Sequence, residues 1–194
     1  FAFDDRLGYL TQCPTNLGTG MRASIMLHLP ALQEHNAIQQ LANTVSKLGL
    51  TIRGIYGEGS KSEGALYQLS NQVTLGISEQ AAIENLLGIA SQIIRQERVS
   101  RESLSQNPHF EDRVWRSLGL LRTARLLSHD EFMALISNVR VGIAVRVIEG
   151  LSLDVIGELL NDAQPATLML HAGEDMEPLQ RDALRARMVR ERLA

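Results

Sequence analysis

The first residues with chemical potential lie in one ten-residue run near the start of the chain. Cys13 opens the run and Arg22 closes it, in the order Cys-Pro-Thr-Asn-Leu-Gly-Thr-Gly-Met-Arg. A cysteine reacts as its thiolate, which nearby cations or a well-placed hydroxyl stabilise, and Thr15 is a neighbour of the right kind. A lone cysteine is most often a small buried hydrophobe, so the fixed spacing of the whole run carries the prediction of a reactive site.

A second run holds Arg53 and Glu58, in the order Arg-Gly-Ile-Tyr-Gly-Glu. The planar guanidinium of arginine presents parallel N–H donors that match a phosphate group. Phosphoryl transfer depends mainly on positioning and on neutralising the charge of the phosphate oxygens, which arginines such as Arg22 and Arg53 can do. A single arginine is more often a solvated surface charge. The sequence contains neither a Walker-type phosphate loop nor a dinucleotide glycine fingerprint.

Together these runs resemble the signature of the ATP:guanidino phosphotransferases, the family of the creatine and arginine kinases and their bacterial relatives. The resemblance implies that Cys13 contacts the substrate guanidinium, which is a poor nucleophile because it is cationic and delocalised. It also implies that Glu58 places a carboxylate against the same group, at the start of a loop that closes over the substrates. Cys13 and Glu58 are therefore the expected catalytic residues.

The same resemblance predicts a nucleotide site in which Arg22 and Arg53 grip the phosphates of ATP. The expected nucleotide-contacting residues are Arg22, Ala23, Ser24, Ile25 and Met26 in the first run and Arg53, Gly54, Ile55, Tyr56, Gly57 and Glu58 in the second. Mg²⁺ is the expected metal. Because no obvious cluster of metal ligands stands out in the sequence, Mg²⁺ would be held mainly through the nucleotide.

Within this family, residues 20–30 and 53–60 are similar to the bacterial protein-arginine kinases. Metabolite kinases end soon after a long helix, whereas this chain continues with a helical pattern to residue 194. The continuation holds the sequence Arg-Asp-Ala-Leu-Arg-Ala, which resembles the motif by which protein-arginine kinases bind phosphoarginine at a second, allosteric site. The residues expected at that site are Arg181, Asp182, Arg185 and Ala186, and positions 181 and 185 share a helix face. The competing interpretation of this arginine-rich helix is a solvated charged face.

The resemblance implies a kinase that phosphorylates arginine side chains of proteins with ATP and Mg²⁺. In the family this modification marks proteins for a Clp-type protease in stress responses, and an activator protein stimulates the kinase. The family's chains are longer at the N-terminus, so we expect this chain to lack the front of the active site and to have negligible activity alone. An alternative of another class is a non-catalytic regulatory module, which predicts phosphoarginine binding without ATP binding.

The elements that must position these residues follow two different patterns. Residues 1–104 predict an α+β fold, part of a catalytic domain with an antiparallel sheet flanked by helices. Alternating apolar residues indicate strands over residues 25–29, 50–56 and 66–69. Helical spacing indicates a helix over 38–48 that Gly49 caps, and a long helix that begins after Ser78.

Residues 105–194 predict an all-helical C-terminal domain. The polar stretch over residues 103–108 indicates a linker between the two domains. Ser128 and Glu131 form a capping-box pattern at the start of one helix. Apolar residues at helical spacing indicate helices over residues 114–126, 128–143 and 152–160, and from 178 to the end.

Composition narrows the class of protein. The 194 residues are 44% hydrophobic and 21% charged, as in a soluble globular protein. A net charge of -3 gives no general attraction to nucleic acid or to an anionic membrane, and no apolar stretch has the length of a membrane helix. The single cysteine favours a cytoplasmic location.

Two further alternatives concern partners. Residues 152–160 are loosely similar to a helix-turn-helix element, which would make the helical half a nucleic-acid reader, but acidic residues are interleaved throughout it. The apolar faces of the helices are compatible with a homodimer.

Overall fold

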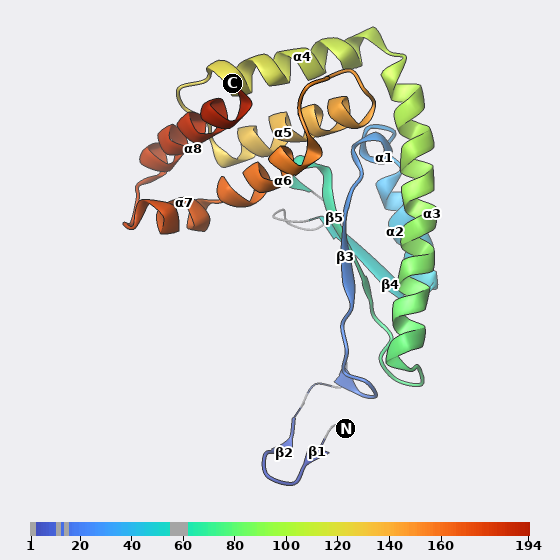
Figure 1. Cartoon of the computed structure of the whole chain (residues 1–194). Coiled ribbons are helices and arrows are strands. Elements are labelled where there is room, and N and C mark those ends of the chain that lie inside the picture. The colour runs from blue at the N-terminus through green and yellow to red at the C-terminus, as the bar shows by residue number, and fades with distance from the viewer. Residues whose placement is uncertain (1–2, 11–12, 14–15, 55–61) are drawn as a thin grey trace. The chain divides into compact units, whose positions relative to one another are not determined.

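The computed structural model describes residues 3–10, 13, 16–54 and 62–194 (Figure 1). The chain divides into two compact units. One unit comprises Phe1–Ser62 and Leu66–Arg98, and the other comprises Glu63–Ala65 and Val99–Ala194. The predicted domain boundary at residue 104 stays a prediction, because this division falls earlier, inside the helix α3 (Glu79–Ser105).

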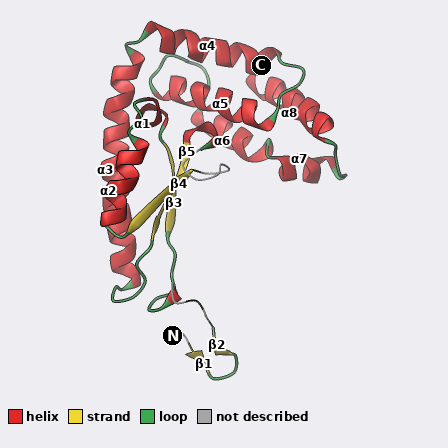
Figure 2. Ribbon diagram, turned by 180° about the vertical axis from the view of Figure 1, so that it is seen from behind, coloured by secondary structure: helices red, strands yellow, loops and turns green. Residues whose placement is uncertain are grey.

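The first unit is built on a three-stranded antiparallel sheet, drawn in yellow in Figure 2. Strand β5 (Leu66–Asn71) lies between β3 (Ser24–His28) and β4 (Leu50–Gly54). The predicted strands are therefore confirmed, and β5 continues past the predicted end at residue 69. Strand β4 ends at Gly54, before the predicted end at residue 56, and residues 55 and 56 lie outside the described residues.

One face of this sheet forms the core of the first unit. Helices α1 (Pro30–Glu34), α2 (Ile38–Lys47) and α3 contribute apolar side chains to it. Because successive side chains of a strand point to opposite faces, alternate residues of each strand face this core. The buried core residues are Leu27, Leu29, Leu32, Val45, Leu50, Tyr67, Leu69, Leu86, Ile89, Ala90 and Ile93. The residues between them on the strands form a second, polar face.

Local signals set the ends of these helices. Helix α2 is followed by Gly49, which has φ of +74° and turns the chain into β4, as predicted. The hydroxyl of Ser78 accepts from the backbone N–H of Ala81 at 3.2 Å, which confirms the predicted start of α3. The predicted linker over residues 103–108 is too long: α3 runs to Ser105, its Leu104 is buried, and the next helix begins at Pro108, so only residues 106 and 107 lie outside a helix.

The second unit consists of helices and the short 3₁₀ helix Glu63–Ala65. Its helices are α4 (Pro108–Thr123), α5 (His129–Ala144), α6 (Leu153–Asp162), α7 (Pro165–Ala172) and α8 (Pro178–Leu193). Ser128 and Ser152 cap α5 and α6 through their hydroxyls, as the sequence indicated. The short helix α7 was not predicted.

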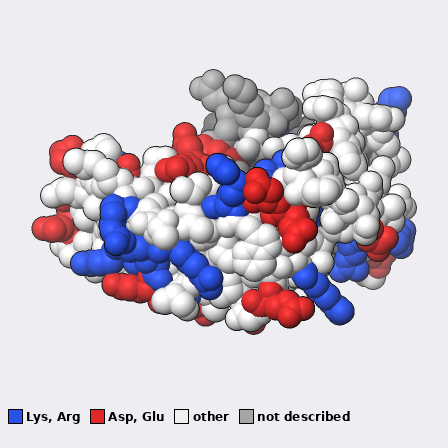
Figure 3. Space-filling view, turned by 90° about the horizontal axis from the view of Figure 1, so that it is seen from above, with Lys and Arg blue, Asp and Glu red and all other residues white. Residues whose placement is uncertain are grey.

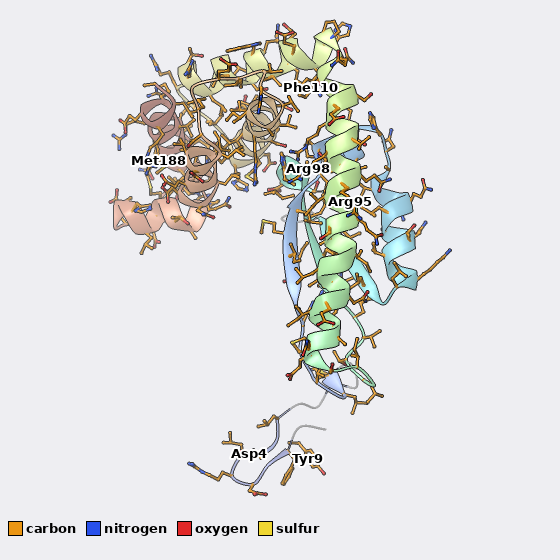
Figure 4. The ribbon with its side chains drawn as sticks, turned by 45° about the vertical axis from the view of Figure 1, so that its right-hand side comes forward. Asp4, Tyr9, Arg95, Arg98, Phe110 and Met188 are labelled. Carbon is orange, nitrogen blue, oxygen red and sulfur yellow. The ribbon has the colours of Figure 1, made fainter. Side chains whose placement is uncertain are left out.

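The core of the second unit is apolar and close-packed. Phe110, from the first turn of α4, is 2% exposed and is labelled in Figure 4. Other fully buried residues come from α4 itself and from each of the remaining helices: Val114, Leu121, Phe132, Met133, Ile136, Val139, Ile156, Leu159, Leu168 and Val189. This core fixes the positions of the polar side chains that lie at the helix ends.

The segment Glu63–Ala65 packs on α5 although it lies between β4 and β5 in the sequence. A Cβ on Gly64 would lie 2.9 Å from the carbonyl oxygen of Met133, so the backbones approach closely. The Glu63 carboxylate lies 3.1 Å from Nε2 of His129.

The first residues of the chain form a separate small hairpin. Strand β1 (Phe3–Asp4) pairs with β2 (Gly8–Tyr9), and the rings of Phe3 and Tyr9 pack edge to face at 5.0 Å. Within the described residues, no helix is long and apolar enough to cross a membrane.

Candidate functional site

The polar face of the three-stranded sheet brings the two predicted phosphate-binding runs together. In the register of the sheet, Gln68 of β5 is paired with Met26 of β3 on one side and with Arg53 of β4 on the other. Paired residues on neighbouring strands point to the same face. Arg53 therefore projects from the same face as Met26 and Gln68, opposite the apolar core, and all three side chains are exposed.

Arg22 reaches this face from the segment just before β3. Its Nη2 donates to the hydroxyl of Ser70 at 3.2 Å. Ser70 and Gln68 are alternate residues of β5 and lie on one face, about 7 Å apart along the strand. The guanidinium of Arg22 is thus held one row away from Arg53. Two cations on one surface repel each other, and a polyphosphate that bridges them relieves that repulsion.

The backbone around Arg22 is held by Asn71. The Asn71 Oδ1 accepts from the N–H of Ala23 at 2.7 Å, and its Nδ2 donates to the carbonyl of Met21 at 3.0 Å. The resemblance to the guanidino phosphotransferases extends to Ser70 and Asn71 in the sequence but assigns them no individual role, and Gln68 was not singled out. The alternation of β5 would have placed Gln68 and Ser70 on the polar face, but the contacts of Asn71 are visible only in the folded structure.

The glycine-rich turn of the first run packs against the chain just after β5. Gly18 has φ of +84°, and a Cβ at this position would lie 2.1 Å from the carbonyl oxygen of Thr74. The N–H of Thr19 donates to that same oxygen at 2.9 Å. Because only glycine fits this close approach, the turn fixes the path of the chain that leads to Arg22.

The predicted catalytic residues are described only in part. Cys13 is exposed and has a free thiol, and its carbonyl accepts from the N–H of Asn16 at 3.0 Å. Thr15 lies outside the described residues, and so do Ile55, Tyr56, Gly57 and Glu58. The roles of Cys13 and Glu58 therefore stay predictions.

The second candidate site lies at the start of α8. The guanidinium of Arg185 is 1% exposed and donates through Nη1 to the carboxylate of Asp182 at 2.7 Å. It also donates to the backbone carbonyls of Ala163, at the end of α6, and Leu127, just before α5, at 2.9 and 2.7 Å. The arginine thus joins three helices of the second unit, as a donor to carbonyls that lack a partner within a helix.

The other residues of this motif differ in exposure. Nη1 of Arg181 donates to the carbonyl of Met176 at 2.7 Å, and Arg181 remains partly exposed. The Asp182 side chain is 28% exposed, whereas Ala186 is buried. A ligand from solvent can therefore reach Arg181 and Asp182 directly, and Arg185 supports them from inside.

A hollow of about 480 Å³ lies beside this motif, between α7 and α8. Its apolar wall includes Leu184, which is part of the motif, and Met188, which is labelled in Figure 4. The full lining is His171, Ala172, Glu174, Met176, Leu184, Arg187, Met188 and Glu191. The hollow combines an apolar surface with charges of both signs.

The remaining arginines of α8 show that its face is not simply solvated. Arg190 donates to the carbonyl of Ala124 at the end of α4. Arg192 pairs with the carboxylates of Glu158 and Asp162 at 2.7 and 3.2 Å. With Arg185 buried, the interpretation of this helix as a wholly solvated charged face is wrong. On the face drawn in Figure 3, Lys and Arg side chains lie among Asp and Glu rather than in an uninterrupted basic stripe.

The histidines and acidic residues give no sign of a metal centre in the described part of the chain. No group of three or more His, Cys, Asp or Glu side chains there is arranged to hold a metal ion. His171 lies 3.9 Å from the carboxylate of Asp162, and its side chain is 55% exposed.

An antiparallel sheet with helices packed on it, followed by a helical unit, is the fold that the resemblance to the guanidino phosphotransferases implied. Residues 1–100 match the family described as ATP:guanido phosphotransferase, C-terminal catalytic domain, and residues 107–194 match the Protein-arginine kinase McsB C-terminal domain. The chain therefore belongs to the ATP:guanido phosphotransferase family, in its protein-arginine kinase branch.

Individual relatives lead to the same branch. The chain is 49% identical over 195 residues to a protein-arginine kinase of Desulforamulus reducens and 51% identical over 195 residues to one of Brevibacillus brevis. It is 46% identical over 195 residues to a protein-arginine kinase of Bacillus subtilis. Each alignment covers 100% of this chain but only 55%, 55% and 54% of the respective relative, so the chain spans about half their length.

Proposed function

We propose that this chain forms the C-terminal part of a protein-arginine kinase and that the polar face of its sheet binds the phosphates of ATP. The observation that carries the proposal is the placement of two arginines on one face. Arg53 lies across from Gln68, and the guanidinium of Arg22 is held at Ser70, one row further along the same strand. The names of the relatives support arginine side chains of proteins as the substrate.

In this function Arg22 and Arg53 would hold the phosphate groups by paired N–H donors and offset the charge that spreads over the phosphate oxygens. A nitrogen of the substrate guanidinium forms a bond to the γ-phosphorus, the bond from that phosphorus to the bridging oxygen of ADP breaks, and the nitrogen loses a proton. By resemblance, Cys13 and Glu58 would orient the guanidinium. Mg²⁺, when bound through the nucleotide, would neutralise further phosphate charge.

The test uses the full-length protein to which this chain belongs. Arg22→Ala and Arg53→Ala are each expected to raise the KM for ATP and to lower kcat. In each single variant kcat/KM should fall at least about 100-fold, because a charge-assisted contact to phosphate is lost. Arg116→Ala is the matched control, since the Arg116 side chain is 76% exposed on α4. Variants with the kinetics of this control would refute the proposal.

We further propose that the start of α8 binds phosphoarginine as a regulatory ligand. The partly exposed Arg181 and Asp182 would contact its phosphate and guanidinium, Arg185 and Ala186 would hold them in place, and the adjoining hollow gives room for the rest of the ligand. This site also supports the alternative of a non-catalytic phosphoarginine-binding module. Binding of ATP by the full-length protein distinguishes a kinase from such a module.

Calorimetric titration of free phosphoarginine into the full-length protein tests this site. Arg181→Ala and Asp182→Asn are expected to weaken binding at least about tenfold, because each removes a charged contact, while Arg116→Ala leaves it unchanged. Saturable binding that survives in both site variants would refute the location. Binding of ATP together with phosphoarginine would support a regulated kinase.

The wider setting follows from the resemblance. We propose that the kinase marks proteins for a Clp-type protease in the cytoplasm during stress and is stimulated by an activator protein. A homodimer through the helical unit is part of this proposal, and light scattering on the full-length protein tests it, since a monomeric mass would contradict it.

A further inference from the structure

Two consecutive residues at the end of β5 hold Arg22 and the residues on either side of it from the two faces of the sheet. Ser70 lies on the polar face, and its hydroxyl accepts from the guanidinium of Arg22 at 3.2 Å. Asn71 lies on the opposite face, because neighbouring residues of a strand alternate. Its side-chain amide holds the backbone on both sides of Arg22.

The side-chain amide of Asn71 makes three hydrogen bonds to the backbone: its oxygen accepts one and its nitrogen donates two. Oδ1 accepts from the N–H of Ala23, which belongs to the peptide group after Arg22. Nδ2 donates to the carbonyl of Met21, in the peptide group before Arg22, and also to the carbonyl of Val73 at 3.1 Å. Both backbone torsions of Arg22 are therefore fixed by one planar side chain, which is 6% exposed.

This pattern selects asparagine among side chains of its size. Aspartate has the same shape but no donor, so it would place a carboxylate oxygen against the carbonyls of Met21 and Val73. Leucine has neither a donor nor an acceptor. The backbone also participates, because the N–H of Asn71 donates to the carbonyl of Ala23 at 3.2 Å.

The contact of Ser70 orients the far end of the same side chain. Ser70 is 1% exposed, so its hydroxyl is shielded from competing water. Among the described residues, Ser70 takes one N–H of the guanidinium, and arginine carries five such donors, so others remain for an anionic ligand. Ordering a long arginine side chain before the ligand arrives saves conformational entropy that binding would otherwise lose.

We propose that Ser70 and Asn71 are positioning residues that pre-organise Arg22 for the phosphates of the nucleotide. The inference rests on the proposed function of Arg22. Ser70 fixes the guanidinium, and Asn71 fixes the backbone from which it extends. The pair therefore sets the affinity for ATP without touching it.

A purely structural role for Asn71 would have a different kinetic signature. If the amide only holds the sheet together, its loss lowers the fraction of folded enzyme. That loss reduces the apparent kcat but leaves the KM for ATP of the remaining active molecules unchanged. If it pre-organises Arg22, the KM for ATP rises in fully folded enzyme.

The experiment measures kcat and the KM for both substrates in the full-length protein, with a thermal unfolding curve for each variant. Asn71→Asp is expected to raise the KM for ATP about tenfold, and Ser70→Ala by about three- to tenfold, because hydrogen bonds to or around a charged group are lost. The KM for the arginine substrate stays within about twofold of the unmodified protein. Asn43→Asp and Ser91→Ala, both at exposed positions of helices, are the matched controls.

A double-mutant cycle with Arg22→Ala makes the test specific. In the Arg22→Ala background, Ser70→Ala is expected to cause no further increase in the KM for ATP, because residues that act through one another are not additive. If Asn71→Asp does not fold, Ser70→Ala and its cycle still decide the matter, since this substitution removes a single hydroxyl.

Two results would overturn the inference, and they differ in what else they overturn. An Arg22→Ala effect on ATP without any effect of Ser70→Ala or Asn71→Asp on the KM for ATP refutes the positioning role and leaves the proposed function standing. An Arg22→Ala variant with unchanged kinetics refutes the proposed function and the positioning role with it.

Discussion

Replacing Arg185 by methionine removes the buried guanidinium that joins α8 to the ends of other helices. The carbonyls of Ala163 and Leu127 and the carboxylate of Asp182 lose their donors. Truncating one partner of a buried charged pair costs about 3–5 kcal/mol, and methionine recovers part of this through its apolar volume, so we expect a net loss of about 3 kcal/mol. Lysine keeps the charge but not the fork of donors, so Arg185→Lys is expected to be intermediate.

Fluorescence provides an assay for the helical unit, because the single tryptophan of the chain, Trp115, lies in α4. With a urea m-value of about 1.5 kcal/mol per M, a loss of about 3 kcal/mol lowers the unfolding midpoint by about 2 M. Arg187→Met is the matched control on the same helix, since Arg187 is exposed. A midpoint of Arg185→Met within about 0.3 M of this control would refute the reasoning, because that difference is close to the uncertainty of such measurements.

Three further predictions concern the first unit. Gly18→Ala is expected to destabilise it by at least about 2 kcal/mol, because the new Cβ would overlap the carbonyl of Thr74 at positive φ; a thermal unfolding curve by circular dichroism measures this. Glu97→Gln is expected to speed hydrogen exchange of the α1 amides about tenfold, since the buried Glu97 carboxylate accepts from two backbone N–H groups at the start of α1. Unchanged exchange would contradict this role. Burial raises the pKa of Tyr67 above its ordinary value, although a hydrogen bond with Ser62 lowers it, so the folded state holds the proton more tightly. The stability that this group contributes is complete below the unfolded pKa of 10.0 and is lost as pH rises through the folded pKa. Between about pH 8 and pH 10.5 the urea midpoint of Tyr67→Phe should therefore drop less than that of the unmodified protein. An equal drop in the two proteins would contradict this prediction.

The sequence predicted the elements whose signals are local. The alternation in β3 and the serine caps of α5 and α6 depend on neighbouring residues, and the structure has them where expected. The linker over residues 103–108 was predicted too long because polarity alone set its bounds, whereas α3, with its buried Leu104, stays helical to Ser105 and the break is confined to residues 106 and 107.

The candidate sites were predictable in identity but not in arrangement. The sequence placed Arg22 and Arg53 in two motifs, yet their common face depends on a strand order in which β5 lies between β3 and β4. Burial of Arg185 could not be read from a helix of alternating charge, because its carbonyl partners lie 22 and 58 residues away. Long-range contacts of this kind are decided by tertiary packing.

The segment Glu63–Ala65 has a consequence for anyone who wishes to divide or recombine this protein. The chain passes from one unit to the other after Ser62, returns before Leu66, and passes again after Arg98. A fragment that begins at Val99 would lack the backbone at Gly64 that covers Met133 and the carboxylate that faces His129. The helical unit therefore cannot be obtained complete as one continuous fragment of the chain. Transplanting it onto another guanidino kinase would require these three residues to be grafted into the β4–β5 connection of the recipient.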